Sequence, residues 1–87
     1  QGQATAKKNA AYTEKQGQYL AFIDAYEILN GRAPAEADML RFFRTTPPTV
    51  HQMILKLEEK GFISRVPRTA RSIKLLIDPQ ELPKLKR

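Results

Sequence analysis

The sequence predicts a mainly α-helical domain that carries a small β-hairpin. Apolar residues recur at helical spacing in three segments between residues 13 and 61, the pattern then changes to period two, and glycine or proline separates the segments. With 87 residues, 41% of them hydrophobic, the chain can bury one small core. We therefore expect one folded domain over residues 13–77, a flexible segment over residues 1–12, and a mobile tail or linker over residues 78–87.

The first predicted helix begins at Thr13 and ends near Asn30. Thr13 and Gln16 have the spacing of a capping box, in which each side chain binds a backbone N–H that lacks a partner in the helix, and Gly31 provides the stop. A broad apolar stripe follows this segment: Tyr19, Leu20, Phe22, Ile23, Tyr26 and Leu29. A stripe at helical spacing is typical of a packed face, so we expect these side chains in the core rather than stacked on nucleobases.

A second helix is predicted over residues 35–43, after Pro34, with three side chains facing inward: Met39, Leu40 and Phe43. The third helix begins where Thr46 is a good N-cap. Pro47 and Pro48 suit the first turn, because the N–H groups there have no partner within the helix and the φ of proline is already near the helical value.

The third helix buries residues that recur at i, i+3, i+4 and i+7: Val50, Met53, Ile54 and Leu57. Gly61 closes it. A short connection, residues 44–46, joins it to the second helix, which predicts a helix-turn-helix. Arg44 stands in this turn where such motifs usually place glycine, and an arginine at positive φ is strained.

After Gly61 the sequence predicts two strands, over residues 62–66 and 72–77, which are rich in β-branched and apolar residues. Residues 67–71 form the tip between them and contain two arginines. A hairpin directly after a helix-turn-helix is a wing, so the fold class is a three-helix winged helix-turn-helix. Arg68 and Arg71 would reach DNA phosphates or the minor groove beside the third helix.

The positive charge of the chain is concentrated in the part that contains the predicted third helix and wing. The net charge is +6, and residues 41–74 hold eight basic residues against two acidic ones, which indicates a candidate surface for a polyanion. There are no cysteines, so disulfides and thiolate zinc sites are excluded. No apolar run approaches the roughly 18 residues that cross a bilayer, and we expect a cytoplasmic protein that joins the nucleoid when bound to DNA.

Several motifs together resemble the N-terminal DNA-binding domain of LexA-type repressors. They are Thr13-Glu14-Lys15-Gln16, Leu20 with Phe22-Ile23, Pro34, Thr49-Val50-His51, the run from Leu57 to Arg65, and the run from Ala70 to Leu75. The resemblance covers residues 13–77. It implies a bacterial transcription regulator that binds double-stranded operator DNA and contacts bases from the start of the third helix.

On that basis the candidate base contacts are Thr46, Pro47, Pro48, Thr49, His51 and Gln52. Gln52 would pair its amide with adenine, His51 would donate a ring N–H to guanine, and a proline would lie against a thymine methyl. The candidate backbone or wing contacts are Arg44, Lys56, Arg65, Arg68, Thr69, Arg71 and Lys74.

Other functions find less support in the sequence. The single histidine has no metal partner or nucleophile at a recognisable spacing, and glycine-rich phosphate loops are absent, so we expect no enzyme, no metal and no cofactor. The alternative that stays open is a winged helix that docks on protein and uses its basic residues for solubility alone. A single small domain contacts only a half-site, so a homodimer on DNA is a possible assembly.

Overall fold

The computed structural model describes residues 12–86, and its elements follow the predicted order. The three helices are α2 (Glu14–Asn30), α3 (Glu36–Phe43) and α4 (Pro47–Glu59). The two antiparallel strands are β1 (Ile63–Ser64) and β2 (Lys74–Leu75), and a 3-10 helix, η1 (Pro79–Glu81), follows them. The predicted winged helix-turn-helix is confirmed. The predicted flexible segment lies outside the described residues except for Tyr12.

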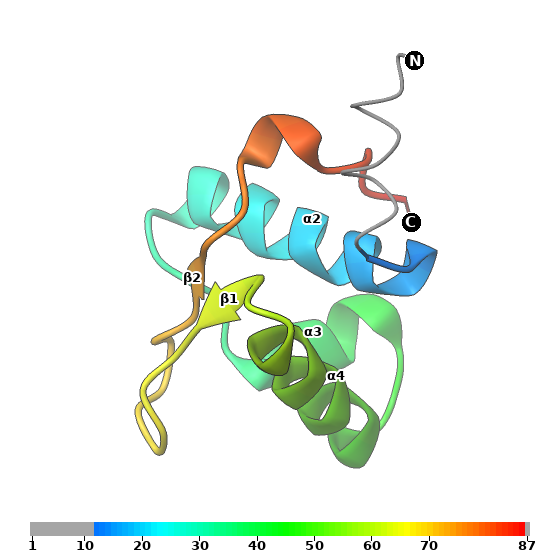
Figure 1. The fold of residues 1–87 in the computed structure, drawn as a ribbon. Helices are drawn as coiled ribbons and strands as arrows, with labels where there is room; N and C mark the ends of the chain where they lie inside the picture. The colour runs from blue at the N-terminus through cyan, green and yellow to red at the C-terminus, as the bar shows by residue number, and fades with distance from the viewer. Residues whose placement is uncertain (1–11, 87) are drawn as a thin grey trace.

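Helix α2 runs across the middle of the domain in Figure 1, with η1 on one side of it and α3, α4 and the wing loop on the other. The predicted capping box is present: the Gln16 N–H donates to the Thr13 hydroxyl at 3.0 Å, and the Thr13 N–H donates to the Gln16 side-chain oxygen at 2.9 Å. Gly31 ends the helix at φ 72°, where its N–H donates to the Glu27 carbonyl. Both ends of the helix are therefore set by local chemistry that the sequence displays.

The core lies between α2 and the α3–α4 pair. Its buried members are Tyr19, Leu20, Phe22, Ile23, Met39, Val50, Ile54, Leu57 and Ile63. Tyr19 and Phe43 stack with their ring centroids 4.1 Å apart, which joins α2 to the end of α3. The predicted inward faces of α3 and α4 are confirmed, although Leu40, Phe43 and Met53 are only partly buried.

The apolar stripe of α2 ends earlier than the sequence predicts. Leu29 is 82% exposed, so its assignment to the core was wrong. Residues 27–32 are all exposed, because no described element packs on the last turn of α2. The spacing of Leu29 from Tyr26 is correct for one face of a helix, but periodicity does not show where the neighbouring elements stop.

The C-terminal segment also differs from the prediction. Residues 78–86 do not form a mobile tail but fold back over α2, as Figure 1 shows. The Gln18 side chain donates to the Lys84 carbonyl at 2.9 Å and accepts from the Lys86 N–H at 2.7 Å. A side-chain amide that offers both a donor and an acceptor thus binds the segment much as a neighbouring strand would.

Gly17 permits this close approach. A Cβ at this position would lie 2.7 Å from the Tyr12 ring and 3.0 Å from Pro83. The Tyr12 hydroxyl donates to the Glu81 carbonyl, and Leu82 and Leu85 pack against the core. The segment therefore covers the beginning of α2, on the side away from α3 and α4.

Candidate nucleic-acid interface

The start of α4 presents all six candidate base contacts to solvent. Thr46 is the N-cap and Pro47 and Pro48 occupy the first helical positions, as predicted. Thr46 makes no side-chain bond to a backbone N–H, which corrects its expected capping role; its hydroxyl instead shares a hydrogen bond of 2.9 Å with the Thr49 hydroxyl. Proline at the second position has no N–H to donate, so the usual capping bond there cannot form.

The last two candidates, His51 and Gln52, are both exposed on α4. The His51 Nδ1 lies 3.4 Å from a Glu36 carboxylate oxygen, with both side chains about half exposed. Gln52 lies beside Pro48 in a shallow hollow between α4 and the first turn of α2. Within residues 12–86 no hydrogen bond holds the Gln52 side chain, so its amide is available to a ligand.

A second shallow hollow lies on the other side of α4, between the wing and the start of α3. Ile54 of α4, Glu36 of α3 and the two residues before it, Pro34 and Ala35, line it together with the wing residues Arg65 and 68–73. The exposed part of α4 thus stands between two hollows, one beside α2 and one beside the wing. This is a ridge, which is the shape that enters a groove of a double helix.

The helix-turn-helix connection contains the strained arginine that the sequence suggested. Arg44 has φ 54° and caps α3, with its N–H donating to the Leu40 carbonyl. Its side chain is exposed at the end of α3, near the start of α4. A left-handed conformation brings an L-residue Cβ close to the following carbonyl, so this turn is held at an energetic cost.

Replacement of Arg44 by glycine is expected to raise the free energy of unfolding by about 0.5–1 kcal/mol, because relief of the left-handed strain exceeds the added entropy of the unfolded chain. Chemical denaturation measures this change. Arg41→Gly, which lies inside α3, serves as the control and should lower the free energy of unfolding. A destabilised Arg44→Gly variant would show that this turn is not strained.

The wing is built differently from the predicted hairpin. Only Ile63 with Leu75 and Ser64 with Lys74 pair as strand residues, so the predicted strands over residues 62–66 and 72–77 were too long. Beyond them the Ser72 hydroxyl accepts from the Val66 N–H at 2.9 Å and donates to the Val66 carbonyl at 3.1 Å. The Ser72 side chain thus takes the place of backbone hydrogen bonds between the strands. Such bonds do not continue here because Pro67 has no N–H to donate and two arginines of the loop adopt positive φ.

The candidate backbone contacts fall into two groups. The exposed ones are Arg44, Lys56, Arg68, Thr69 and Lys74. Arg68 lies in the tip turn with φ 60°, and the Thr69 N–H closes that turn on the Val66 carbonyl at 3.1 Å. The other two, Arg65 and Arg71, are already paired with acidic residues. Arg65 is 19% exposed in its side chain and binds Glu58 at 2.9 Å.

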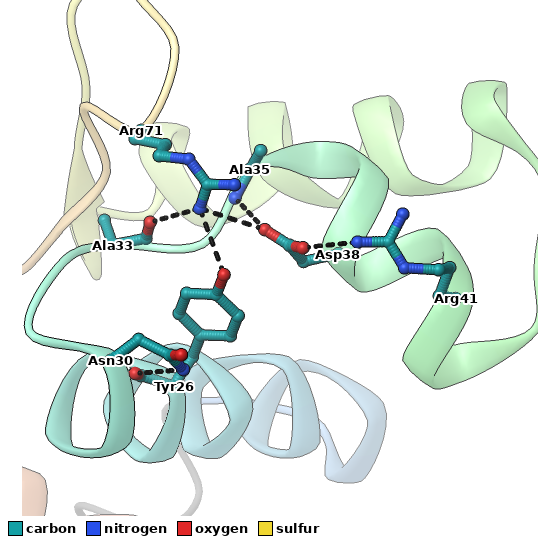
Figure 2. Close-up of polar contacts among 7 residues, drawn as sticks. All are labelled: Tyr26, Asn30, Ala33, Ala35, Asp38, Arg41 and Arg71. Carbon is teal, nitrogen blue, oxygen red and sulfur yellow. Dashed lines mark hydrogen bonds and ion pairs between the residues drawn. The ribbon is translucent and has the colours of Figure 1, made fainter.

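Arg71 points toward the helices rather than outward. Figure 2 shows one nitrogen of its guanidinium facing three oxygens. The Arg71 Nη1 donates to the Tyr26 hydroxyl at 3.2 Å, to the Ala33 carbonyl at 3.1 Å and to the Asp38 carboxylate at 3.1 Å. Arg71, whose φ is 56°, is therefore bonded to α2, to α3 and to the segment between them rather than free at the wing tip.

Asp38 is the centre of this cluster and is 9% exposed. One oxygen accepts from the Ala35 N–H at 2.8 Å, which serves the first turn of α3, and the other binds Arg41 at 2.7 Å. Burial acts to raise the pKa of Asp38, but the hydrogen bond from Ala35 and the charges of Arg71 and Arg41 outweigh it and lower that pKa below its ordinary value of 3.8. The carboxylate is thus ionised at neutral pH.

The sequence of the chain matches a known family. The LexA DNA binding domain model covers residues 9–72. The chain belongs to the LexA DNA-binding domain family. It is 40% identical to a LexA repressor of Thermosipho africanus over 68 residues, which are 78% of this chain and 34% of that protein. It is 42% identical to a LexA repressor of Thermosipho melanesiensis over 64 residues, 74% of this chain and 32% of that protein.

This LexA-type domain spans about a third of the length of the curated relatives that it matches. Among residues 12–86, no helix is both long enough and apolar enough to span a bilayer. In the same described region, no three acidic or histidine side chains gather as metal ligands would.

Two residues of the LexA-type domain were missed by the sequence analysis. Asp38 carried a signal, since it stands three residues after Ala35, the N-cap of α3, which is the spacing at which an acidic side chain reaches back to the N-cap N–H. Tyr26 carried none, because its apolar position in α2 does not indicate that its hydroxyl meets a wing residue 45 positions later.

Proposed function

We propose that this LexA-type domain binds double-stranded DNA sequence-specifically as part of a bacterial transcriptional regulator, with α4 in the major groove and the wing at the backbone or minor groove. One observation carries the proposal: the predicted base contacts at the start of α4 are all exposed on a ridge that the wing flanks. The family match and the name of the repressors to which the chain is similar support the same function.

The side chains of α4 have the chemistry for base recognition. Gln52 offers a donor and an acceptor that match the N7 and N6 edge of adenine, and His51 offers a ring N–H to an acceptor of guanine. Pro47 and Pro48 present apolar rings without competing N–H groups, which suits contact with a thymine methyl. Thr46 and Thr49 stand next to them with hydroxyl groups for a base edge or a phosphate.

Phosphate contacts come from the exposed basic side chains. Four of them are exposed: Arg44 in the turn, Lys56 in α4, Arg68 in the wing tip and Lys74 in β2. Lys56 also lies 3.6 Å from Glu59, but both side chains are more than half exposed, so this pair competes weakly with a phosphate. Thr69 adds a hydroxyl at the wing tip.

Salt dependence tests whether the domain binds DNA at all. Four cationic contacts release counterions, so duplex affinity should fall roughly a hundredfold between about 50 and 200 mM salt. Fluorescence anisotropy with a labelled duplex measures this. The protein-docking alternative instead predicts little duplex affinity at any salt concentration.

Base reading and phosphate binding should separate by mutation. Gln52→Ala is expected to change the sequence preference, because it removes a bidentate base contact from the exposed part of α4. Arg68→Ala should weaken all duplexes similarly and lower the salt slope by about 0.9. Competition between matched and scrambled duplexes measures both effects. Identical losses on the two duplexes for both variants would contradict this division of roles.

We also propose that two copies act together on DNA in the cytoplasm, since one small domain contacts only a half-site. Selection of bound duplexes from a random pool tests this proposal. An inverted repeat with half-sites about one helical turn apart supports a symmetric pair, whereas single unrepeated sites contradict it.

A further inference from the structure

We propose that Arg71 is a positioning residue for DNA binding: through Asp38, Tyr26 and the Ala33 carbonyl it holds the wing beside α4, and DNA affinity depends on this bond. The inference rests on the proposed function, and it changes the predicted role of Arg71 from phosphate contact to internal tether. We name Arg71, Asp38 and the Tyr26 hydroxyl the wing clamp.

The tip of the wing needs such a clamp because few contacts order it, although Ile73 and Leu75 beside it pack against the core. The strands of the wing are two residues long, and residues 66–70 are all exposed. Ser72 and Thr69 close the loop on itself through Val66, but these bonds do not fix its direction relative to α4. A hairpin of this size has marginal stability on its own.

Two arginines connect the loop to the helices, one from each side. Arg65, directly after β1, binds Glu58 of α4 at 2.9 Å. Arg71, three residues before β2, binds Asp38 of α3 and Tyr26 of α2. Figure 2 shows that the Arg71 side chain reaches down from the wing to the junction of α2 and α3. The two bonds together fix the orientation of the wing relative to the three helices.

The clamp also keeps Arg71 from a phosphate. Its Nη1 already faces three acceptors, and the carboxylate among them is almost fully buried. If the Arg71 guanidinium turned away to bind a DNA phosphate, Asp38 would lose the cation that joins it to the wing. The cation left beside Asp38 would be Arg41, whose side chain is 74% exposed. Loss of one partner from a buried charged pair is costly, so the bond to Asp38 persists in the complex.

This arrangement predicts that removal of the Asp38 charge weakens DNA binding, whereas simple electrostatics predicts that it strengthens binding. Removal of a negative charge from a DNA-binding surface ordinarily raises affinity, because it lessens repulsion of the phosphates. If Asp38 orders the wing, its neutral amide variant must instead weaken binding, because the free wing then has to be ordered when DNA binds.

The experiment compares Asp38→Asn with Glu36→Gln by anisotropy on the selected duplex. Both changes remove one negative charge from the first turn of α3, but Glu36 makes no bond to the wing. We expect Glu36→Gln to bind as tightly as the unchanged domain or slightly more tightly, and Asp38→Asn to bind roughly five to tenfold more weakly. Equal or tighter binding by Asp38→Asn would overturn the proposal.

Further variants and measurements distinguish loss of the wing clamp from a folding defect. Tyr26→Phe removes only a hydroxyl of the clamp, and Tyr12→Phe removes a hydroxyl that bonds the distant C-terminal segment. Tyr26→Phe should lower DNA affinity while Tyr12→Phe leaves it unchanged. Thermal unfolding and circular dichroism confirm that each variant is folded, and backbone order parameters for residues 68–70 should fall below about 0.6 in Asp38→Asn. Unchanged wing order would count against the clamp.

Salt titration of Arg71→Gln separates positioning from phosphate contact. We expect lower affinity with an unchanged salt slope, whereas Arg68→Ala should lower the slope by about 0.9. An equal drop in slope for Arg71→Gln would return Arg71 to the phosphate contacts. If the unchanged domain shows no duplex affinity, the proposed function fails; if it binds DNA but Asp38→Asn and Tyr26→Phe bind equally well, the clamp alone fails.

Discussion

Replacement of Leu57 by alanine is expected to lower the free energy of unfolding by about 2–5 kcal/mol, because the side chain is buried in a packed core. Leu57 is 0% exposed, and it lies in α4, where its carbonyl accepts from the N–H of Phe62, the residue before β1, at 3.0 Å. A domain of this size has little stability in reserve, so a large part of the population should unfold near physiological temperature. Urea denaturation followed by circular dichroism measures the change.

Leu29→Ala is the matched control for Leu57→Ala. The chemical change is identical, but Leu29 is 82% exposed on the last turn of α2. Its free energy of unfolding should stay within about 0.5 kcal/mol of the unchanged domain. Comparable losses for the two variants would mean that Leu29 is covered in solution and that the end of α2 packs against something.

Replacement of Asp38 by alanine is expected to lower the free energy of unfolding by about 1–3 kcal/mol at neutral pH, since it removes charge-assisted bonds and the contact with the α3 N-cap N–H. The loss combines three bonds to one nearly buried carboxylate, from Ala35, Arg41 and Arg71. Glu36→Ala, in the same turn, should change stability by at most about 0.5 kcal/mol because that side chain is partly exposed. Similar values for both would contradict the central place of Asp38.

The free energy of unfolding should also depend on pH through the Asp38 carboxylate. The pKa of Asp38 is lower in the folded protein than its ordinary value of 3.8, so its contribution is present above pH 3.8 and is lost as the pH falls through the folded value. The free energy of unfolding of the unchanged domain should therefore decline with acidification below about pH 4, and Asp38→Asn should decline less steeply. Parallel pH profiles for the two proteins would contradict the lowered pKa.

Much of the fold was predictable because its signals are local. The capping box at Thr13, the glycines at positions 31 and 61 and the two prolines at the start of α4 set the helix ends without help from distant residues. The exposed candidate contacts at the start of α4 were found by the same means, since the inward positions Val50 and Ile54 imply which faces remain outside.

The errors concern contacts between distant segments. Leu29 follows the helical period but lies past the last neighbour of α2, and the segment after residue 78 packs on α2 through one glutamine and a glycine gap. The strands are shorter than their β-branched residues suggest, since a serine hydroxyl closes the wing instead.

Local residue chemistry thus settles the three helices, the turn at Arg44 and the outward face of α4, because capping, glycine and proline effects and the helical period act within a few positions. The direction of each wing arginine depends on the folded chain, because a guanidinium binds whichever acceptor lies within reach. Arg68 is exposed in the tip turn, whereas Arg71 meets a carboxylate of α3 and a hydroxyl of α2 that the folded chain brings together.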